Sequence, residues 1–452
     1  MAGDGWTGAF GTGIETILSA ETSSVSPEER ENNFKRNDQI RDLGEIVNVA
    51  AGWGHSVIVC KGDQNETKLY VAGRPFDFQA LLRLYRLPSF IRRSALSLSL
   101  NLDESTTRKS VMPYFEEITL PNGDTPSMDT NNQILAASAG LTAIIGKSGK
   151  AYMFGLNKSG QCGVGDSEAI HIWEPTPITL SKRNEELVVK EVALGLQHGL
   201  VLGKDGSLYA FGKGSRGQLG IADQLLQGEL KEDLKAESNG DFAFSPIRIN
   251  EFELQSEHLK PSKLSDTDSE VLKISAGWNH SASVTKSNHV WIWGKNVLID
   301  SLNGSKTGTI DSMQPIHIKG LPERDILDIS CGSHHTSILL EDGSVYATGI
   351  ATDTNNPVGG ESAVQLVPPG IIDLPIRQFK SHFDRTTIIA GEDGQQILEA
   401  QLWSTADLRR EAVFEPAWVE TVFGACEEVK SIHRGWLHTI ILGQRDPTIT
   451  LR

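Results

Sequence analysis

Five histidines of this chain stand at the same place in a recurring motif, three residues after a glycine and usually directly before a hydroxyl residue. Histidine is a common metal ligand, so such a group could hold an ion if the fold brought its members together. Each histidine belongs to a separate copy of the motif, however, and we expect a repeated structure to keep equivalent residues apart. We therefore predict that each imidazole hydrogen-bonds backbone where a strand begins, with no metal site and no cofactor. The histidines are His55, His198, His280, His335 and His438.

Residue patterns typical of enzymes are missing from the sequence. It has no Gly-x-Ser-x-Gly turn, no phosphate-binding glycine loop at a helix start, and no carboxylate pair at a spacing that indicates acid–base chemistry. The cysteines stand far apart with no Cys-x-x-Cys pair, which favours reduced thiols over disulfides or a zinc site. We therefore predict that the protein catalyses no bond chemistry. The four cysteines are Cys60, Cys162, Cys331 and Cys426.

Each copy of the motif leads into a pattern typical of β-structure. An apolar run follows the histidine, as at residues 57–59, 200–202 and 337–340. A two-residue turn comes next, for example Asp205-Gly206 or Asp342-Gly343, and the returning strand ends in an aromatic residue and a glycine. A further strand has proline near its start. Because proline cannot donate to a ladder, we place this strand at the outer edge of each unit.

The motif occurs seven times, and two of its copies are degenerate. Residues 138–142 lack both the glycine and the histidine, and residues 382–386 keep only the threonine. A repeat of about 50 residues predicts a propeller or a solenoid, in which each unit needs its neighbours to bury its apolar face. We also expect the motif glycines, such as Gly277, to have backbone angles that a Cβ would disfavour.

The two ends of the chain complement each other. The last copy of the motif ends near Leu442 with no returning aromatic-glycine strand after it. Residues 6–13 match the returning strand at residues 209–214 in character. We therefore predict that residues 6–13 complete the last sheet, which would remove an open sheet edge.

These elements, with the Gly-Gln-Leu-Gly type sequences at residues 215–220 and 159–163, resemble the regulator of chromosome condensation repeat family. The resemblance implies an all-β, seven-bladed propeller that forms one domain over residues 1–452. It also implies a protein-binding platform and, within that class, guanine-nucleotide exchange on a small GTPase. No exchange residues can be assigned. The alternatives are an adaptor or assembly factor without exchange activity, in a mitochondrial setting for example, and a tryptophan-based photoreceptor.

Photoreception is the remoter alternative because one residue type of the motif is missing. Light-sensing members of the family place an arginine between the tryptophan and the histidine. In this chain three copies carry tryptophan after the glycine, but the arginine position holds Gly54, Asn279 or Leu437. Packing against the next blade or contact with a partner is the simpler interpretation of these tryptophans.

The two residues between glycine and histidine vary from copy to copy, and the resemblance places their loops on one face of the propeller. Varied side chains on a repeated frame can form a recognition surface, or they can simply pack the loops. The candidate partner-binding residues are Trp53, Leu196, Gln197, Trp278, Asn279, Ser333, His334, Trp436 and Leu437.

Two insertions interrupt the repeats, at residues 74–133 and 221–270. The second is acidic and is predicted to be a loop. The first contains an apolar stripe at helical spacing, flanked by arginines. The stripe suits an acidic groove on a partner or, as a lesser alternative, an anionic membrane surface, or it folds back on the side of a blade. Its residues are Phe78, Leu81 and Tyr85, with Leu82, and the flanking arginines are Arg83 and Arg86.

Composition bounds the remaining possibilities. The 452 residues are 38% hydrophobic and 22% charged, which is typical of a globular protein. A net charge of −16 disfavours direct binding to nucleic acid. There is no apolar run long enough to span a bilayer, and no leader is expected before Trp6. We expect a monomer in the cytoplasm, with mitochondria and the nucleus as alternatives.

Overall fold

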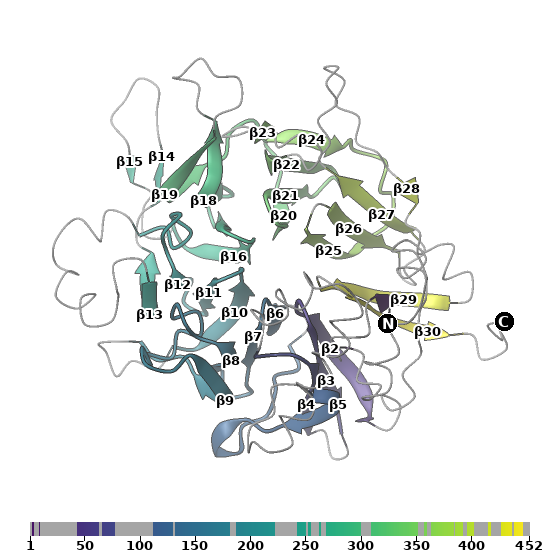
Figure 1. Cartoon of the computed structure of the whole chain (residues 1–452). Coiled ribbons are helices and arrows are strands. Elements are labelled where there is room, and N and C mark those ends of the chain that lie inside the picture. The colour runs from purple at the N-terminus through teal and green to yellow at the C-terminus, as the bar shows by residue number, and fades with distance from the viewer. Residues whose placement is uncertain are drawn as a thin grey trace, which may run out of the picture. The chain divides into compact units, whose positions relative to one another are not determined.

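The computed structural model describes nineteen stretches of the chain. They are residues 2–3, 9, 43–62, 66–76, 112–129, 132–180, 187–221, 242–249, 252–254, 262–263, 268–299, 309–350, 357–358, 363–383, 385–391, 396–401, 415–416, 426–435 and 438–445. Within them the fold is all β, a propeller of small antiparallel sheets, with one 3-10 turn at Pro121–Gly123 (Figure 1). No helix in this part of the chain is long and apolar enough to cross a membrane.

The first three sheets follow the chain in simple up-and-down order. The first holds β2 (Glu45–Ala51), β3 (His55–Lys61), β4 (Thr67–Gly73) and β5 (Met112–Ile118). The second holds β6 (Leu135–Ser138), β7 (Leu141–Ile145), β8 (Ala151–Leu156) and β9 (His171–Pro177). The third holds β10 (Val189–Leu194), β11 (His198–Gly203), β12 (Leu208–Lys213) and β13 (Phe242–Ile249).

The next three sheets repeat this order. The fourth holds β16 (Val271–Ala276), β17 (His280–Thr285), β18 (Val290–Ile299) and β19 (Thr309–His317). The fifth holds β20 (Ile326–Cys331), β21 (His335–Leu340) and β22 (Val345–Ile350), with β23 (Pro357–Val358) and β24 (Val364–Val367) both paired to β22. The sixth holds β25 (Ile376–His382), β26 (Arg385–Ala390), β27 (Gln396–Gln401) and β28 (Glu415–Pro416). A separate two-stranded ribbon joins β14 (Glu253–Leu254) and β15 (Ser262–Lys263).

The seventh repeat differs from the predicted four-stranded form. Its described strands are β29 (Cys426–Arg434), β30 (His438–Arg445) and β1 (Ala2–Gly3), so the described residues form six full sheets and a three-stranded seventh. The N-terminal strand does pair with the last repeat, Ala2 opposite Thr439 and Gly3 opposite His438. It lies earlier than the predicted 6–13. Of that range only Ala9 is described; it is buried, and its carbonyl accepts a hydrogen bond from Ser56 Oγ in the first sheet (2.6 Å).

Outer-strand prolines lie in the last strand of their sheets as predicted, and Pro113 stands near the start of its strand, but Pro175 and Pro315 stand well inside theirs. Pro246, for example, stands in β13, the last strand of the third sheet, where the register with β12 shifts between Ala210 and Gly212. At such a bulge the missing N–H of proline interrupts no regular pair of ladder bonds. The proline of the outer strand therefore lies beside the aromatic-glycine end of the preceding strand, where the ladder is irregular.

Two compact units divide the chain: residues 1–194 with 244–246 and 433–440, and residues 195–243 with 247–432 and 441–452. In the first, a core joins the first two sheets through Val57, Phe76 and Phe154. In the second unit, separate cores join the fourth sheet to the fifth and the fifth to the sixth. The apolar runs after His55, His280 and His335 are thus buried against a neighbouring sheet. The acidic insertion at 221–270 contributes β13, β14 and β15, and most of its remaining residues lie outside the described part.

Candidate functional site

Each motif histidine hydrogen-bonds the hydroxyl of another repeat through its Nε2 atom. The prediction of a backbone partner therefore missed the main contact, because the hydroxyl lies on a different strand and sequence spacing cannot show it. The Nε2–Oγ pairs are His55–Thr142 (3.0 Å), His198–Ser281 (2.9 Å), His280–Thr336 (3.1 Å), His335–Thr386 (3.4 Å) and His438–Ser56 (3.0 Å). The motif therefore forms a buried histidine–hydroxyl hydrogen bond between two sheets, which we call the latch.

Burial sets the charge of these histidines. It lowers the pKa of His55 and His198 to about 4 and that of His280 and His438 to about 3. A neutral imidazole at physiological pH suits a hydrogen bond to a hydroxyl in a low-dielectric interior. Among the described residues no group of three or more histidine, cysteine or acidic side chains is arranged to hold a metal ion. Cys60, Cys162 and Cys331 are buried free thiols.

The motif glycine makes room for the histidine of its own copy. A Cβ on Gly277 would lie 2.1 Å from Cε1 of His280 and 2.5 Å from the Gly332 carbonyl oxygen. The expectation of unusual backbone angles is wrong, since none of the motif glycines has a positive φ. The reason for glycine at this position is steric, because the ring packs directly on its Cα.

The predicted surface residues separate into two groups. Trp53 is only 9% exposed, and Ser333 is buried with its Oγ hydrogen-bonded to the Phe383 carbonyl (2.6 Å), so both contribute to packing. Five others are partly exposed. They are Leu196, Gln197, Trp278, Asn279 and His334. The remaining candidates, Trp436, Leu437, Phe78, Leu81, Tyr85, Arg83 and Arg86, lie outside the residues whose side chains are described.

Trp278 is the centre of an aromatic cluster contributed by three repeats. Its ring meets His334 edge-on with centroids 5.2 Å apart, and Phe383 in the same manner at 5.9 Å. Phe383 was missed because its repeat lacks both glycine and histidine, although it aligns with the tryptophan position of other copies. Such edge-to-face contacts hold the indole in one orientation.

Backbone hydrogen bonds connect this cluster to its neighbours. The Leu196 N–H donates to the Trp278 carbonyl (3.1 Å), and the Lys295 N–H donates to the Asn279 carbonyl (2.8 Å). Lys213 donates through its backbone to the Gln197 carbonyl (2.8 Å) and through Nζ to Gln197 Oε1 (3.3 Å).

We call this set the Trp278 surface. It brings two lysines beside partly exposed aromatic and amide groups on an acidic protein. Both lysines directly follow the aromatic-glycine end of a strand, a shared repeat position that could have identified them from sequence. Burial and the charge of Lys295 lower the pKa of His334. The arrangement presents aromatic, amide and positively charged groups together. Its members are Leu196, Gln197, Lys213, Trp278, Asn279, Lys295, His334 and Phe383.

Comparison with protein families identifies regulator of chromosome condensation repeats. One model of this repeat matches residues 148–202 and 205–284, and a second matches residues 189–218, 271–298 and 326–355.

Curated relatives carry several different activities in their names. The ultraviolet-B receptor UVR8 of Arabidopsis thaliana is 26% identical over 248 residues, 50% of this chain and 54% of that protein. The secretion-regulating guanine nucleotide exchange factor of Bos taurus is 22% identical over 241 residues, 52% of this chain and 44% of that protein. The human probable E3 ubiquitin-protein ligase HERC6 is 24% identical over 201 residues, 44% of this chain and 16% of that protein. The chain therefore spans about half or less of the length of these relatives.

Solved structures match over almost the whole chain. Human WBSCR16 aligns with a TM-score of 0.63 at 13% identity, covering 98% of both chains. Yeast RCC1 (Prp20), solved bound to Kap60, aligns with a TM-score of 0.61 at 16% identity, covering 99% of this chain and 88% of that one. At these identities the matches establish the propeller fold.

Proposed function

This chain belongs to the family of proteins built from regulator of chromosome condensation repeats, and from that premise we propose that it is a protein-binding propeller that promotes nucleotide release from a small GTPase. An exchange factor of this kind needs no catalytic side chain. It binds the nucleotide-free GTPase more tightly than the loaded form, and this difference in affinity drives the release of nucleotide. A relative named as a guanine nucleotide exchange factor supports the proposal.

The Trp278 surface is the observation that carries the proposal. Partly exposed tryptophan is among the residues that contribute most to protein interfaces, particularly where neighbouring groups hold it rigid. Trp278 is held between His334 and Phe383, so little side-chain entropy would be lost on binding. Lys213 and Lys295 add positive charge that would favour an acidic contact on the partner.

The test is release of a fluorescent GDP analogue from a panel of small GTPases, with and without the full-length protein. We expect acceleration for at least one GTPase, and we expect Trp278→Ala to reduce it by about thirtyfold, since a tryptophan that dominates an interface contributes about 2 kcal/mol and each increment of about 1.4 kcal/mol is a factor of ten. The matched control is Met313→Ala on the outer strand β19, where the side chain is 45% exposed. That variant should keep full activity.

An adaptor without exchange activity is the second candidate. It is favoured by the range of names among relatives with the same repeats, which include a receptor and a ubiquitin ligase. No acceleration with any GTPase, combined with a partner whose capture depends on Trp278, would support this candidate and overturn exchange. We do not propose photoreception, because Trp278 packs on a histidine and a phenylalanine and is followed by Asn279.

A further inference from the structure

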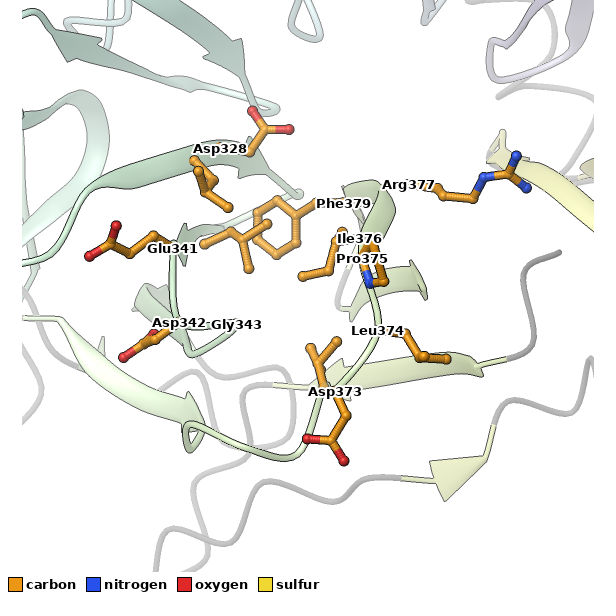
Figure 2. Close-up of a pocket in the computed structure, with 13 residues that line it drawn as sticks. Asp328, Glu341, Asp342, Gly343, Asp373, Leu374, Pro375, Ile376, Arg377 and Phe379 are labelled. Atoms are coloured by element: carbon orange, nitrogen blue, oxygen red, sulfur yellow. The ribbon is translucent and has the colours of Figure 1, made fainter. Parts of the chain in front are cut away.

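A pocket of about 390 Å³ lies where the fifth and sixth sheets meet, at the ends of β20 and β25 opposite their motif loops (Figure 2). Its floor is apolar and belongs to the core between these sheets: Leu339, Ile372 and Phe379 are each less than 10% exposed. In Figure 2, Ile376 and Phe379 occupy its middle. The pocket shares no residue with the Trp278 surface.

Two leucines on the rim remain open to solvent. Leu327 is 47% exposed and Leu374 is 38% exposed. Leu327 stands at a β-bulge, since the register of β20 with β21 shifts between Ile326 and Asp328. The bulge leaves Leu327 without a partner in the ladder and turns it out of the regular strand.

Carboxylates surround this apolar centre. Glu341, Asp342 and Asp373 lie around the periphery in Figure 2, while the lining cation, Arg377, extends away from them. Outside the lining, Arg324 approaches Glu341 and Asp342 at 3.9 and 3.8 Å, and its side chain is 55% exposed. Ion pairs this long and this exposed are weak and can be exchanged for others.

We infer that this pocket binds a segment of a partner protein in which a large apolar side chain is flanked by lysine or arginine. The apolar side chain covers Leu327 and Leu374 and enters above Phe379. Its basic neighbours reach Glu341 and Asp373, which would repel an acidic segment. The chain therefore has a second interaction surface, whose partner chemistry is opposite to that expected at the Trp278 surface.

The probe is a fluorescein-labelled hexapeptide, Lys-Arg-Leu-Phe-Lys-Arg, measured by fluorescence anisotropy with the full-length protein. The comparison peptide carries glutamate at the four basic positions. We expect binding of the basic peptide only, weakened about tenfold by Leu374→Ser through loss of apolar contact. Glu341→Gln with Asp373→Asn should weaken binding several-fold and reduce its dependence on salt.

The matched control is Leu272→Ser. Leu272 is 38% exposed and stands at the corresponding bulge of β16, but it does not line the pocket. This variant should bind the basic peptide as the wild type does. Absence of binding, equal binding of both peptides, or equal loss in Leu272→Ser and Leu374→Ser would each overturn the inference. GTPase nucleotide release should be unchanged by Leu374→Ser, so the two proposals can fail separately.

Discussion

The motif loops of repeats 4 and 2 differ in which residues have been kept. Repeat 4 has Gly277 and His280, and the imidazole packs on the glycine while bonding Thr336. Repeat 2 has Ser138 and Leu141 at the same positions, and Leu141 is fully buried. Glycine and histidine are thus lost together. Once the imidazole is absent, one of the two contacts that exclude a Cβ is gone, and the carbonyl of the next repeat is the other.

The hydroxyl residue follows a different rule. Repeat 2 keeps Thr142, whose partner is the intact His55, and repeat 6 keeps Thr386, whose partner is the intact His335. Repeat 3 has Gly199 instead of a hydroxyl, and it follows the repeat in which Leu141 replaces histidine. Each glycine is therefore coupled to the histidine of its own copy, and five of the six hydroxyls to the histidine of the preceding copy. The exception is Thr439 of repeat 7, because repeat 6 has Arg385 in place of histidine.

Low pH should reduce the stability of the protein, because the histidines in the buried histidine–hydroxyl bonds become protonated. Because folding lowers the pKa of His280 from 6.5 to about 3, the unfolded chain binds more protons between these values. Stability from this histidine is fully present above pH 6.5 and is lost as the pH falls toward 3. Several buried histidines act in the same direction, so we expect the melting temperature to fall steeply below pH 6.

His280→Leu should reduce this pH dependence, measured by calorimetry across pH 4 to 7, because one proton-linked site is removed. An unchanged slope would show that the buried imidazoles do not control acid stability.

Gly277→Val tests the steric role of the glycine. Its added carbons would overlap the His280 ring, and we expect a loss of about 3 kcal/mol in the free energy of unfolding, measured with urea.

The coupling between glycine and histidine can be measured with a double-mutant cycle of Gly277→Ala and His280→Leu. We expect an interaction energy of at least about 1 kcal/mol, with the alanine costing less once the ring is gone. Additive effects would contradict the coupling that the degenerate repeats indicate.

Ser138→Ala in repeat 2 should have the smallest effect. Because Leu141 replaces the imidazole there, a Cβ is already accommodated, and we expect a change within about 1 kcal/mol. A loss as large as that of Gly277→Val in the same urea titration would remove the distinction between the two loops.

The sequence was sufficient for the repeated architecture. Alternating apolar runs, Asp-Gly turns and outer-strand prolines such as Pro246 are local signals, and the strands lie where these patterns predicted them. The N-terminal strand was correctly assigned to the last repeat but placed too late in the chain. The short pair Ala2 and Gly3 has little strand character of its own, so its pairing with β30 depends on the partner strand.

The candidate site was only partly predictable. Trp278 and His334 were found from their place in the motif, whereas Phe383, Lys213 and Lys295 were not. Ser333 was assigned to the surface, but its hydroxyl is turned to the Phe383 carbonyl of the next repeat. The direction of a side chain within a loop depends on the neighbouring sheet. The sequence of one repeat does not show which groups of the next repeat it will contact.

By itself, therefore, the sequence determined the class of fold, the period of the repeat and the positions of glycine, histidine and hydroxyl in each copy, because these residue types recur at fixed spacing along the chain. Tertiary structure decided which hydroxyl each histidine bonds, why the glycine is needed and how Leu327 and Leu374 come to share a rim with Glu341 and Asp373. The physical reason is that the histidine–hydroxyl bonds and the pocket rim join segments of different sheets, and that the direction of each imidazole over its own glycine follows from those bonds, so packing rather than local spacing sets which groups meet.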